Sequence, residues 1–266
     1  MSRVQVVLMI LAVAALPALA DTWWYTYEAD GTYPEEEGWS RIAMGGGAQR
    51  SFEDGALVLD SSAGTGICDS YSKGMPSLPD PNDPTSVFVC EWRLCVDWVD
   101  PFDKDPGVAL MFEGFGEVNL KYTTDRICSA YEFEYIADFE PWVFHTYTLT
   151  TSTMQTYTLA IDGSVVWNGV MSPYGPASVV RFGDLVVGNP SRSRWDYVRY
   201  GVVSVLAGDV NCDGTVDFLD INPFVAALTV PADMPGCGVL NADINQDGVV
   251  DFADINPFVD LMLQAR

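Results

Sequence analysis

The chain has 266 residues, of which 37 are acidic and 13 are basic, so its formal net charge is -24 with histidine neutral. A surface this acidic repels the phosphates of nucleic acids and the head groups of anionic lipids, which argues against both as partners. Metal cations and neutral polymers remain as candidate ligands.

Residues 1–20 have the features of a secretory signal peptide. Arg3 supplies a basic start, residues 6–16 form an apolar run, and Ala18-Leu19-Ala20 ends the segment with small residues. The alternative is a membrane anchor, but the apolar run is short for a bilayer span. We therefore expect cleavage before Asp21 and a protein that is secreted or held at the cell surface without membrane insertion.

Composition changes near Ala207, which predicts two domains after the signal peptide. Before this point Thr, Tyr, Trp, Val and Gly dominate in short alternating runs, and after it Asp, Asn and Gly recur in two matching blocks. We expect a first domain over residues 21–206 and a second over residues 207–266.

The first domain is predicted to be antiparallel β structure. Residues 87–98 alternate, with one face made of Phe88, Cys90, Trp92, Leu94, Val96 and Trp98. Residues 156–161 and 164–167 flank Asp162-Gly163, the pair that a tight hairpin turn requires. Further strands are expected over residues 56–59, 107–112, 131–135, 145–150, 181–187 and 195–205. Many short strands separated by turns are typical of a β-sandwich.

Six cysteines follow the signal peptide: Cys68, Cys90, Cys95, Cys128, Cys212 and Cys237. An even number in an exported protein favours disulfides over metal thiolates. Cys212 and Cys237 are the two in the second domain, so they are predicted to pair. The other four allow three connectivities, and the sequence does not choose among them.

Three stretches of the first domain resemble the concanavalin A-like lectin/glucanase superfamily in its laminin-G-like branch. They are residues 54–59, residues 147–149 and residues 157–163. The resemblance covers roughly residues 22–206 and implies a two-sheet jelly roll associated with carbohydrate.

The second domain contains an internal repeat. The block from Asp209 and the block from Asp243 are offset by 34 residues, and 13 of 17 aligned positions are identical. Each block places oxygen-bearing residues at the positions from which a twelve-residue loop wraps Ca²⁺. The repeat therefore predicts two calcium ions.

The ligand positions are the same in both loops. In the first loop the candidate ligands are Asp209, Asn211, Asp213, the carbonyl of Thr215, Asp217 and Asp220. In the second they are Asp243, Asn245, Asp247, the carbonyl of Val249, Asp251 and Asp254. Gly214 and Gly248 permit the sharp turn, and Val216 and Val250 should pack between the loops. After each loop, Asn222 and Asn256 are expected to cap a short helix that Pro223 or Pro257 begins.

Aspartate rather than glutamate at the twelfth position, together with a duplicated loop-then-helix unit, resembles the type I dockerin module over residues 208–263. Dockerins attach proteins, commonly polysaccharide-degrading enzymes, to cohesin domains, so the resemblance implies a cohesin-like partner. It also implies that loop positions ten and eleven set partner choice; they are Phe218-Leu219 and Phe252-Ala253 here. The alternative is that Phe218 and Phe252 are core residues.

No catalytic residue is assigned in the first domain. Glu132 and Glu134 share one face of a predicted strand, but the third acid of a jelly-roll glucanase is missing, and Glu113 and Glu117 are similarly ambiguous. His145 is interpreted as a strand residue rather than a catalytic base, because no nucleophile motif lies nearby. Trp23, Trp24, Trp39, Trp142, Trp167 and Trp195 could stack on sugars if exposed, although most tryptophans in a sandwich of this size belong to its core. Trp23 and Trp24 are adjacent, so in one strand they would face opposite sides. The favoured interpretation is a non-catalytic, secreted β-sandwich that serves carbohydrate association or structure, with a dockerin-like attachment module. The alternative is a dockerin-bearing glycoside hydrolase acting on O-glycosyl bonds, or a polysaccharide lyase.

Overall fold

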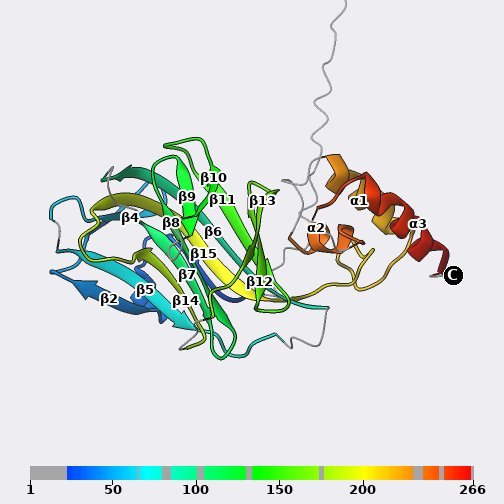
Figure 1. The fold of residues 1–266 in the computed structure, drawn as a ribbon, viewed down its shortest axis with the longest axis horizontal. Coiled ribbons are helices and arrows are strands. Elements are labelled where there is room, and N and C mark those ends of the chain that lie inside the picture. The colour runs from blue at the N-terminus through cyan, green and yellow to red at the C-terminus, as the bar shows by residue number, and fades with distance from the viewer. Residues whose placement is uncertain are drawn as a thin grey trace, which may run out of the picture.

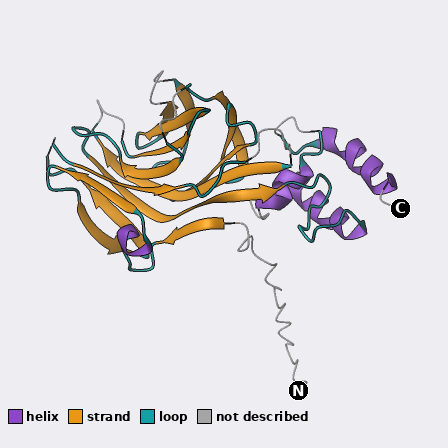
Figure 2. Ribbon diagram, turned by 90° about the horizontal axis from the view of Figure 1, so that it is seen from below, coloured by secondary structure: helices purple, strands orange, loops and turns teal. Residues whose placement is uncertain are grey.

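The computed structural model describes residues 23–64, 66–79, 85–100, 105–129, 134–173, 177–229, 236–245 and 249–264. The described part of the chain forms two antiparallel sheets followed by a small helical region, which confirms the predicted fold class (Figures 1 and 2). In both views the helices of this C-terminal region gather at one end of the sheets. None of the helices in the described residues is long and apolar enough to cross a membrane.

Sheet A has eight strands. Seven lie in the order β13 (Ser164–Val170), β12 (Thr156–Ile161), β11 (His145–Thr151), β6 (Ser86–Val99), β15 (Ser191–Ser204), β4 (Ala56–Asp60) and β3 (Gln49–Glu53), and β1 (Trp23–Glu28) also pairs with β15.

Sheet B has seven strands and packs on sheet A. Their order is β10 (Tyr135–Asp138), β9 (Arg126–Ser129), β8 (Gly116–Tyr122), β7 (Gly107–Phe112), β14 (Val179–Asp184), β5 (Cys68–Gly74) and β2 (Ser40–Met44). One apolar cluster, in which Trp92 and Trp195 are fully buried, fills the space between the sheets. The Trp92 indole donates a 3.0 Å hydrogen bond to the Tyr122 hydroxyl across this core.

The Asp-Gly hairpin is confirmed. Asp162 has a φ of 49° and Gly163 a φ of 77°, so both adopt the positive φ values of a two-residue turn between β12 and β13. Asp54 and Gly55 make the same turn between β3 and β4, with φ values of 52° and 80°.

The prediction that Trp98 lies on the core face of its strand is wrong. Arg192 pairs with Trp98 whereas Ser193 pairs with Val96, so Asp97 is an extra residue in β6. Such a bulge shifts the side-chain alternation by one residue. Trp98 is consequently 40% exposed, and Val99 takes a place in the core.

Other strand predictions differ at their ends. The strand expected over residues 181–187 is β14, which ends at Asp184, and the one expected over residues 195–205 is β15, which begins at Ser191. The strand expected over residues 131–135 falls partly outside the described residues, and β10 begins at Tyr135.

The prediction of disulfides among the four sandwich cysteines is wrong, because Cys68, Cys90, Cys95 and Cys128 are buried free thiols. Cys90 and Cys95 lie five residues apart on β6, so they point to opposite faces. Cys68 on β5 and Cys128 on β9 are separated by three strands of sheet B, which is more than a disulfide can span. In the helical region Cys212 is disulfide-bonded, and the side chain of Cys237, its predicted partner, lies outside the described residues.

The helical region contains α1 (Ile221–Thr229), α2 (Gly236–Ala242) and α3 (Ile255–Gln264). Single-turn 3-10 helices, η3 (Phe218–Asp220) and η5 (Phe252–Asp254), lead into α1 and α3, and a third, η2 (Pro34–Glu37), follows β1. Leu240 of α2 packs on a cluster of Val87, Val89 and Val203, so α2 contacts the ends of β6 and β15.

Candidate metal-binding module

Asp220, the twelfth residue of the first loop, organises that loop. Its side chain is fully buried, and its Oδ1 accepts a 2.9 Å hydrogen bond from the Asn211 backbone N–H. Its Oδ2 accepts a 2.8 Å hydrogen bond from the Asp217 N–H. One carboxylate therefore holds the third and ninth positions of the loop together.

Asp209, the first residue of the loop, closes the opposite side. Its two carboxylate oxygens accept hydrogen bonds of 3.0 and 2.9 Å from the backbone N–H groups of Asp213 and Gly214. Gly214 has a φ of 88°, which favours glycine at this turn. Burial raises the pKa of Asp209, and the negative charges of Asp220 and Asp213 raise it further. A bound cation would relieve this repulsion.

Asn211 and Asp213 of the first loop also form hydrogen bonds within the loop. Asn211 Oδ1 accepts from the Asp213 N–H at 2.9 Å, and Asn211 Nδ2 donates to Asp213 Oδ2 at 2.8 Å. Asp213 Oδ1 accepts from the Thr215 hydroxyl at 2.6 Å, and this hydrogen bond is the main reason that the Asp213 pKa is lowered.

The second loop repeats the arrangement around Asp254, which is also fully buried. Asp254 Oδ1 accepts from the backbone N–H groups of Ile244 and Asn245 at 2.8 and 3.0 Å, and Oδ2 accepts from Asp251 at 3.0 Å. Asp243 and Val249 are described, whereas Asp247 and Gly248 lie outside the described residues.

The donor set fits a calcium ion in kind. The first loop offers four carboxylates and an amide oxygen, the hard donors that Ca²⁺ prefers. Within the described residues, however, no three acidic, histidine or cysteine side chains converge closely enough to hold a metal. The carboxylates of Asp209 and Asp220 instead accept hydrogen bonds from backbone N–H groups of the loop.

The predicted helix caps are wrong. Asn222 and Asn256 are the second residues of α1 and α3, inside each helix. Asp217 and Asp251 are instead the N-caps of η3 and η5: their side chains accept from the N–H groups of Leu219 and Ala253 at 2.7 and 2.6 Å. Asp220 and Asp254 complete the two capping boxes. Pro223 and Pro257 fall in the first turn of α1 and α3, where no intrahelical donor is required of them.

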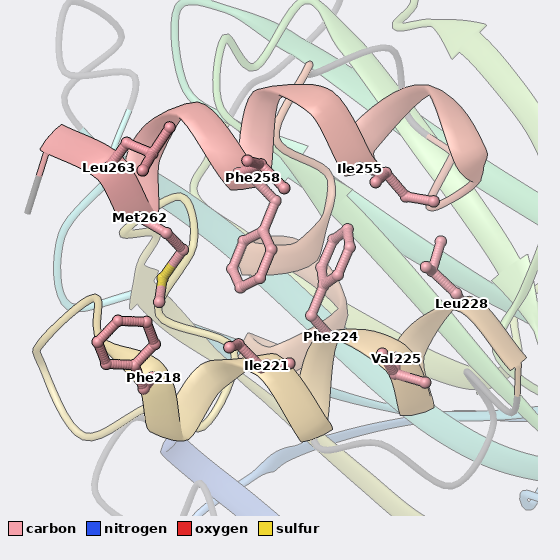
Figure 3. A pocket seen from close by; sticks show the side chains of 10 residues that line it. Phe218, Ile221, Phe224, Val225, Leu228, Ile255, Phe258, Met262 and Leu263 are labelled. Atoms are coloured by element: carbon pink, nitrogen blue, oxygen red, sulfur yellow. The ribbon is translucent and has the colours of Figure 1, made fainter.

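The two repeats pack through their helices, as their symmetry predicts. The rings of Phe224 and Phe258 stack with centroids 4.2 Å apart between α1 and α3 (Figure 3). An open apolar groove of about 370 Å³ runs beside them, lined by Phe218, Ile221, Phe224, Val225, Leu228, Ile255, Phe258, Val259, Met262 and Leu263. Phe218 is 66% exposed and Phe252 is 82% exposed, so neither is a core residue.

The candidate catalytic residues that the structure describes lie in different environments. Glu132 lies outside the described residues, and Glu134 is exposed just before β10. His145 is held by the Asp162 carboxylate at 2.6 Å and faces the carbonyl of Glu140 at 2.9 Å. The ring nitrogens of His145 are therefore engaged in structural contacts.

The tryptophans divide between core and surface. Trp39 is 3% exposed and Trp195 is fully buried, whereas Trp142 is 66% exposed and has a φ of 63°. Trp142 is therefore the most exposed tryptophan among the described residues.

Two polar clusters in the sandwich were missed in the sequence. Asp105 and Asp184 are buried together with Lys121, whose ammonium lies 3.1 Å from Asp105 Oδ1. Burial and the neighbouring Asp105 raise the pKa of Asp184 to about 9, so the Asp184 carboxyl group is protonated at neutral pH. The second cluster, Glu117 and Asn119, contains buried acceptor atoms without a hydrogen-bond partner among the described residues. In the sequence Asp105 belongs to an Asp-Pro pair, and Glu117 and Asn119 belong to an alternating strand segment. Neither pattern indicates a buried polar cluster.

Residues 207–257 match the type I dockerin domain family, so the C-terminal region is a type I dockerin domain. This family is one whose members bind calcium and attach to cohesins. No curated protein matches the chain.

Several solved structures are similar to the chain at low identity. The binding domain of paraclostridial mosquitocidal protein 1 is 12% identical with a TM-score of 0.47, over 71% of this chain and 50% of that one. A Bacillus subtilis protein of unknown function with a galectin-like fold is 13% identical with a TM-score of 0.42, over 69% of this chain and 97% of that one. Trypanosoma rangeli sialidase is 13% identical with a TM-score of 0.41, and this chain covers 26% of it with 57% of its own length.

Proposed function

We propose that this protein is a secreted, non-catalytic β-sandwich that a calcium-dependent type I dockerin module attaches to a cohesin domain. Residues 1–20 would be removed on export, residues 21–206 would form the cargo domain, and residues 207–266 would form the attachment module. The cargo domain would serve carbohydrate association or a structural role.

The observation that carries the proposal is the duplicated loop with its buried twelfth-position aspartate. Asp220 and Asp254 are both fully buried, and each accepts hydrogen bonds from both arms of its loop. Both oxygens of Asp220 and the Oδ2 of Asp254 each accept one of these hydrogen bonds and keep a lone pair for a metal, so each loop would take one ion, and two ions would bind in all. The ligands would be the twelve residues predicted from the repeat.

The surface that would meet the cohesin is unusually apolar. Phe218 and Phe252 occupy equivalent places in the two repeats and are both exposed. Because a partner that recognises one repeat could also recognise the other, the module would dock in two orientations. An apolar partner surface would bury these rings, at roughly 2 kcal/mol for each fully covered phenylalanine.

The proposal is tested by immobilising the chain without residues 1–20 and measuring which members of a panel of cohesin domains it retains. We expect at least one cohesin to be retained in calcium and released by chelation. Phe218→Ala and Phe252→Ala should each leave binding through the other repeat, and the double variant should lose it. Trp142→Ala, which removes an equally exposed aromatic ring from the sandwich, is the matched control and should bind normally.

Retention that is equal with and without calcium would refute the calcium-dependent attachment, as would failure of every cohesin to bind. A parallel assay for reducing-sugar release from polysaccharides tests the non-catalytic assignment. Release that survives purification would favour the glycoside hydrolase alternative.

A further inference from the structure

The apolar groove between α1 and α3 is symmetric in its middle, because equivalent positions of the two repeats line it. We call it the α1–α3 groove. The equivalent pairs are Ile221 and Ile255, Phe224 and Phe258, Val225 and Val259, and Leu228 and Met262. The two ends of the groove therefore decide whether a partner meets the same surface in both docking orientations.

The two ends of the α1–α3 groove differ. Phe218 and Leu263 line one end, beside Met262 (Figure 3). Their counterparts in the other repeat are Phe252 and Thr229, and neither lines the groove. The Thr229 hydroxyl donates a 2.9 Å hydrogen bond to a backbone carbonyl within α1. The groove thus continues over large apolar side chains at the Phe218 end, whereas the opposite end has a polar residue in place of Leu263.

The rim of the groove is open to solvent. Phe218 is 66% exposed, Leu263 is 59% exposed and Val225 is 52% exposed, while the stacked rings of Phe224 and Phe258 are buried between the helices. A continuous apolar surface of this kind marks a place where an apolar group of a partner binds. The groove is continuous with Phe218, which the proposed docking surface already includes.

The charges around the groove indicate which partner fits. The charged residues of η3, α1, η5 and α3 are all acidic, and Asp260 is the exposed one. Residues 207–266 contain ten aspartates and one arginine, so an excess of negative charge remains with two calcium ions bound. This charge disfavours a second copy of the chain as the occupant, because like charges would face each other. It favours a partner with lysine or arginine around its apolar group.

We propose that the α1–α3 groove receives one bulky apolar side chain of the cohesin, flanked there by lysine or arginine, and that Leu263 makes one docking orientation the preferred one. The inference rests on the attachment role proposed above and names the chemistry of the partner. In the preferred orientation the side chain of the partner lies between Phe218 and Leu263. In the reversed orientation it meets Phe252 and Thr229, and loses apolar contact.

The test titrates the calcium-saturated chain, without residues 1–20, with the cohesin that the panel identifies. Leu263→Thr gives the second repeat the residue that the first repeat has, and should weaken binding roughly fivefold or more. Leu206→Thr is the matched control: Leu206 is 44% exposed, does not line the groove, and its variant should bind like the unchanged chain.

Single phenylalanine variants report the orientation. Phe218→Ala should weaken binding roughly tenfold and Phe252→Ala about twofold at most, because Phe218 lines the groove and Phe252 does not. In a Leu263→Thr background the two losses should become similar, since the ends of the groove are then alike. Thr229→Leu makes the opposite change and should also bring the two losses together, so it decides the matter if Leu263→Thr does not fold.

Raising the NaCl concentration from about 50 to about 500 mM should weaken binding several-fold, because salt screens basic partner groups from the acidic module. Failure of every cohesin to bind would remove both proposals. Calcium-dependent binding that Leu263→Thr leaves unchanged, equal losses for Phe218→Ala and Phe252→Ala, or binding that salt does not weaken would overturn this inference alone. So would a dimer of the unchanged chain, detected by light scattering, that Leu263→Thr dissociates.

Discussion

The buried Asp105–Asp184 pair makes the stability of the sandwich depend on pH in an unusual direction. Asp184 has its pKa raised from 3.8 to about 9 by burial and by Asp105. A raised folded-state pKa contributes stability that is fully present below the unfolded value, declines as pH rises, and is gone above the folded value. Between about pH 4 and pH 9 the folded chain therefore holds one proton that the unfolded chain releases.

One proton corresponds to about 1.4 kcal/mol of unfolding free energy for each pH unit. Raising the pH from 7 to 9 should thus cost the sandwich about 2–3 kcal/mol, or roughly 5–10 °C in melting temperature. The measurement is thermal unfolding of the calcium-saturated chain at several pH values, followed by near-ultraviolet circular dichroism.

Asp184→Asn supplies the decisive comparison. The amide has nearly the same shape, cannot ionise, and can donate to Asp105, so the pH dependence should flatten and the variant should be the more stable chain at pH 9. Asp54→Asn changes an exposed hairpin-turn aspartate and should keep the slope of the unchanged chain. A melting temperature that is constant or rises from pH 7 to pH 9, or equal slopes for Asp184→Asn and the unchanged chain, would refute the raised pKa of Asp184.

Three further outcomes are expected. Asp220→Ala should reduce calcium stoichiometry from two ions to one in calorimetric titration, whereas Asn222→Ala, an exposed residue of α1, should leave it at two. Asn241→Ala should lower the urea-unfolding free energy of the helical region by about 1–3 kcal/mol, because Asn241 donates to the Asp209 carbonyl and accepts from the Leu206 N–H; an unchanged transition would contradict this. Unfolding the chain without reductant should expose four thiols to a thiol reagent. If the unfolded chain did not react with the reagent, the predicted sandwich disulfides would be supported instead.

Local rules predicted the elements whose determinants are local. The turn between β12 and β13 follows from Asp162-Gly163, and the core face of β6 follows its alternation as far as Val96. Trp98 departs from the pattern because Asp97 is accommodated as a bulge opposite β15. A bulge depends on the partner strand, so one strand read alone could not reveal it.

The loops were predictable because they repeat, whereas the sandwich clusters were not. Six ligand positions at fixed spacing, found twice, leave few other interpretations. The environment of Asp184 instead depends on Asp105, which lies far away in the sequence and meets it through the packing of β14 beside β7. The free thiols could not be predicted for the same reason. The number of cysteines does not reveal how the strands pair, and strand pairing decides which cysteines lie close enough for a disulfide.

The capping boxes connect helix formation to metal binding in the dockerin. Asp217 and Asp220 are both candidate calcium ligands, and the same carboxylates cap η3 at the entrance to α1. A cation in the loop would reduce the repulsion between these carboxylates while each keeps a lone pair for its backbone N–H. Asn241 of α2 donates to the Asp209 carbonyl, and the neighbouring Leu240 packs on Val87 and Val203. The first loop is therefore connected to the sandwich through α2. Calcium should therefore stabilise the junction between sandwich and dockerin as well as the loops themselves.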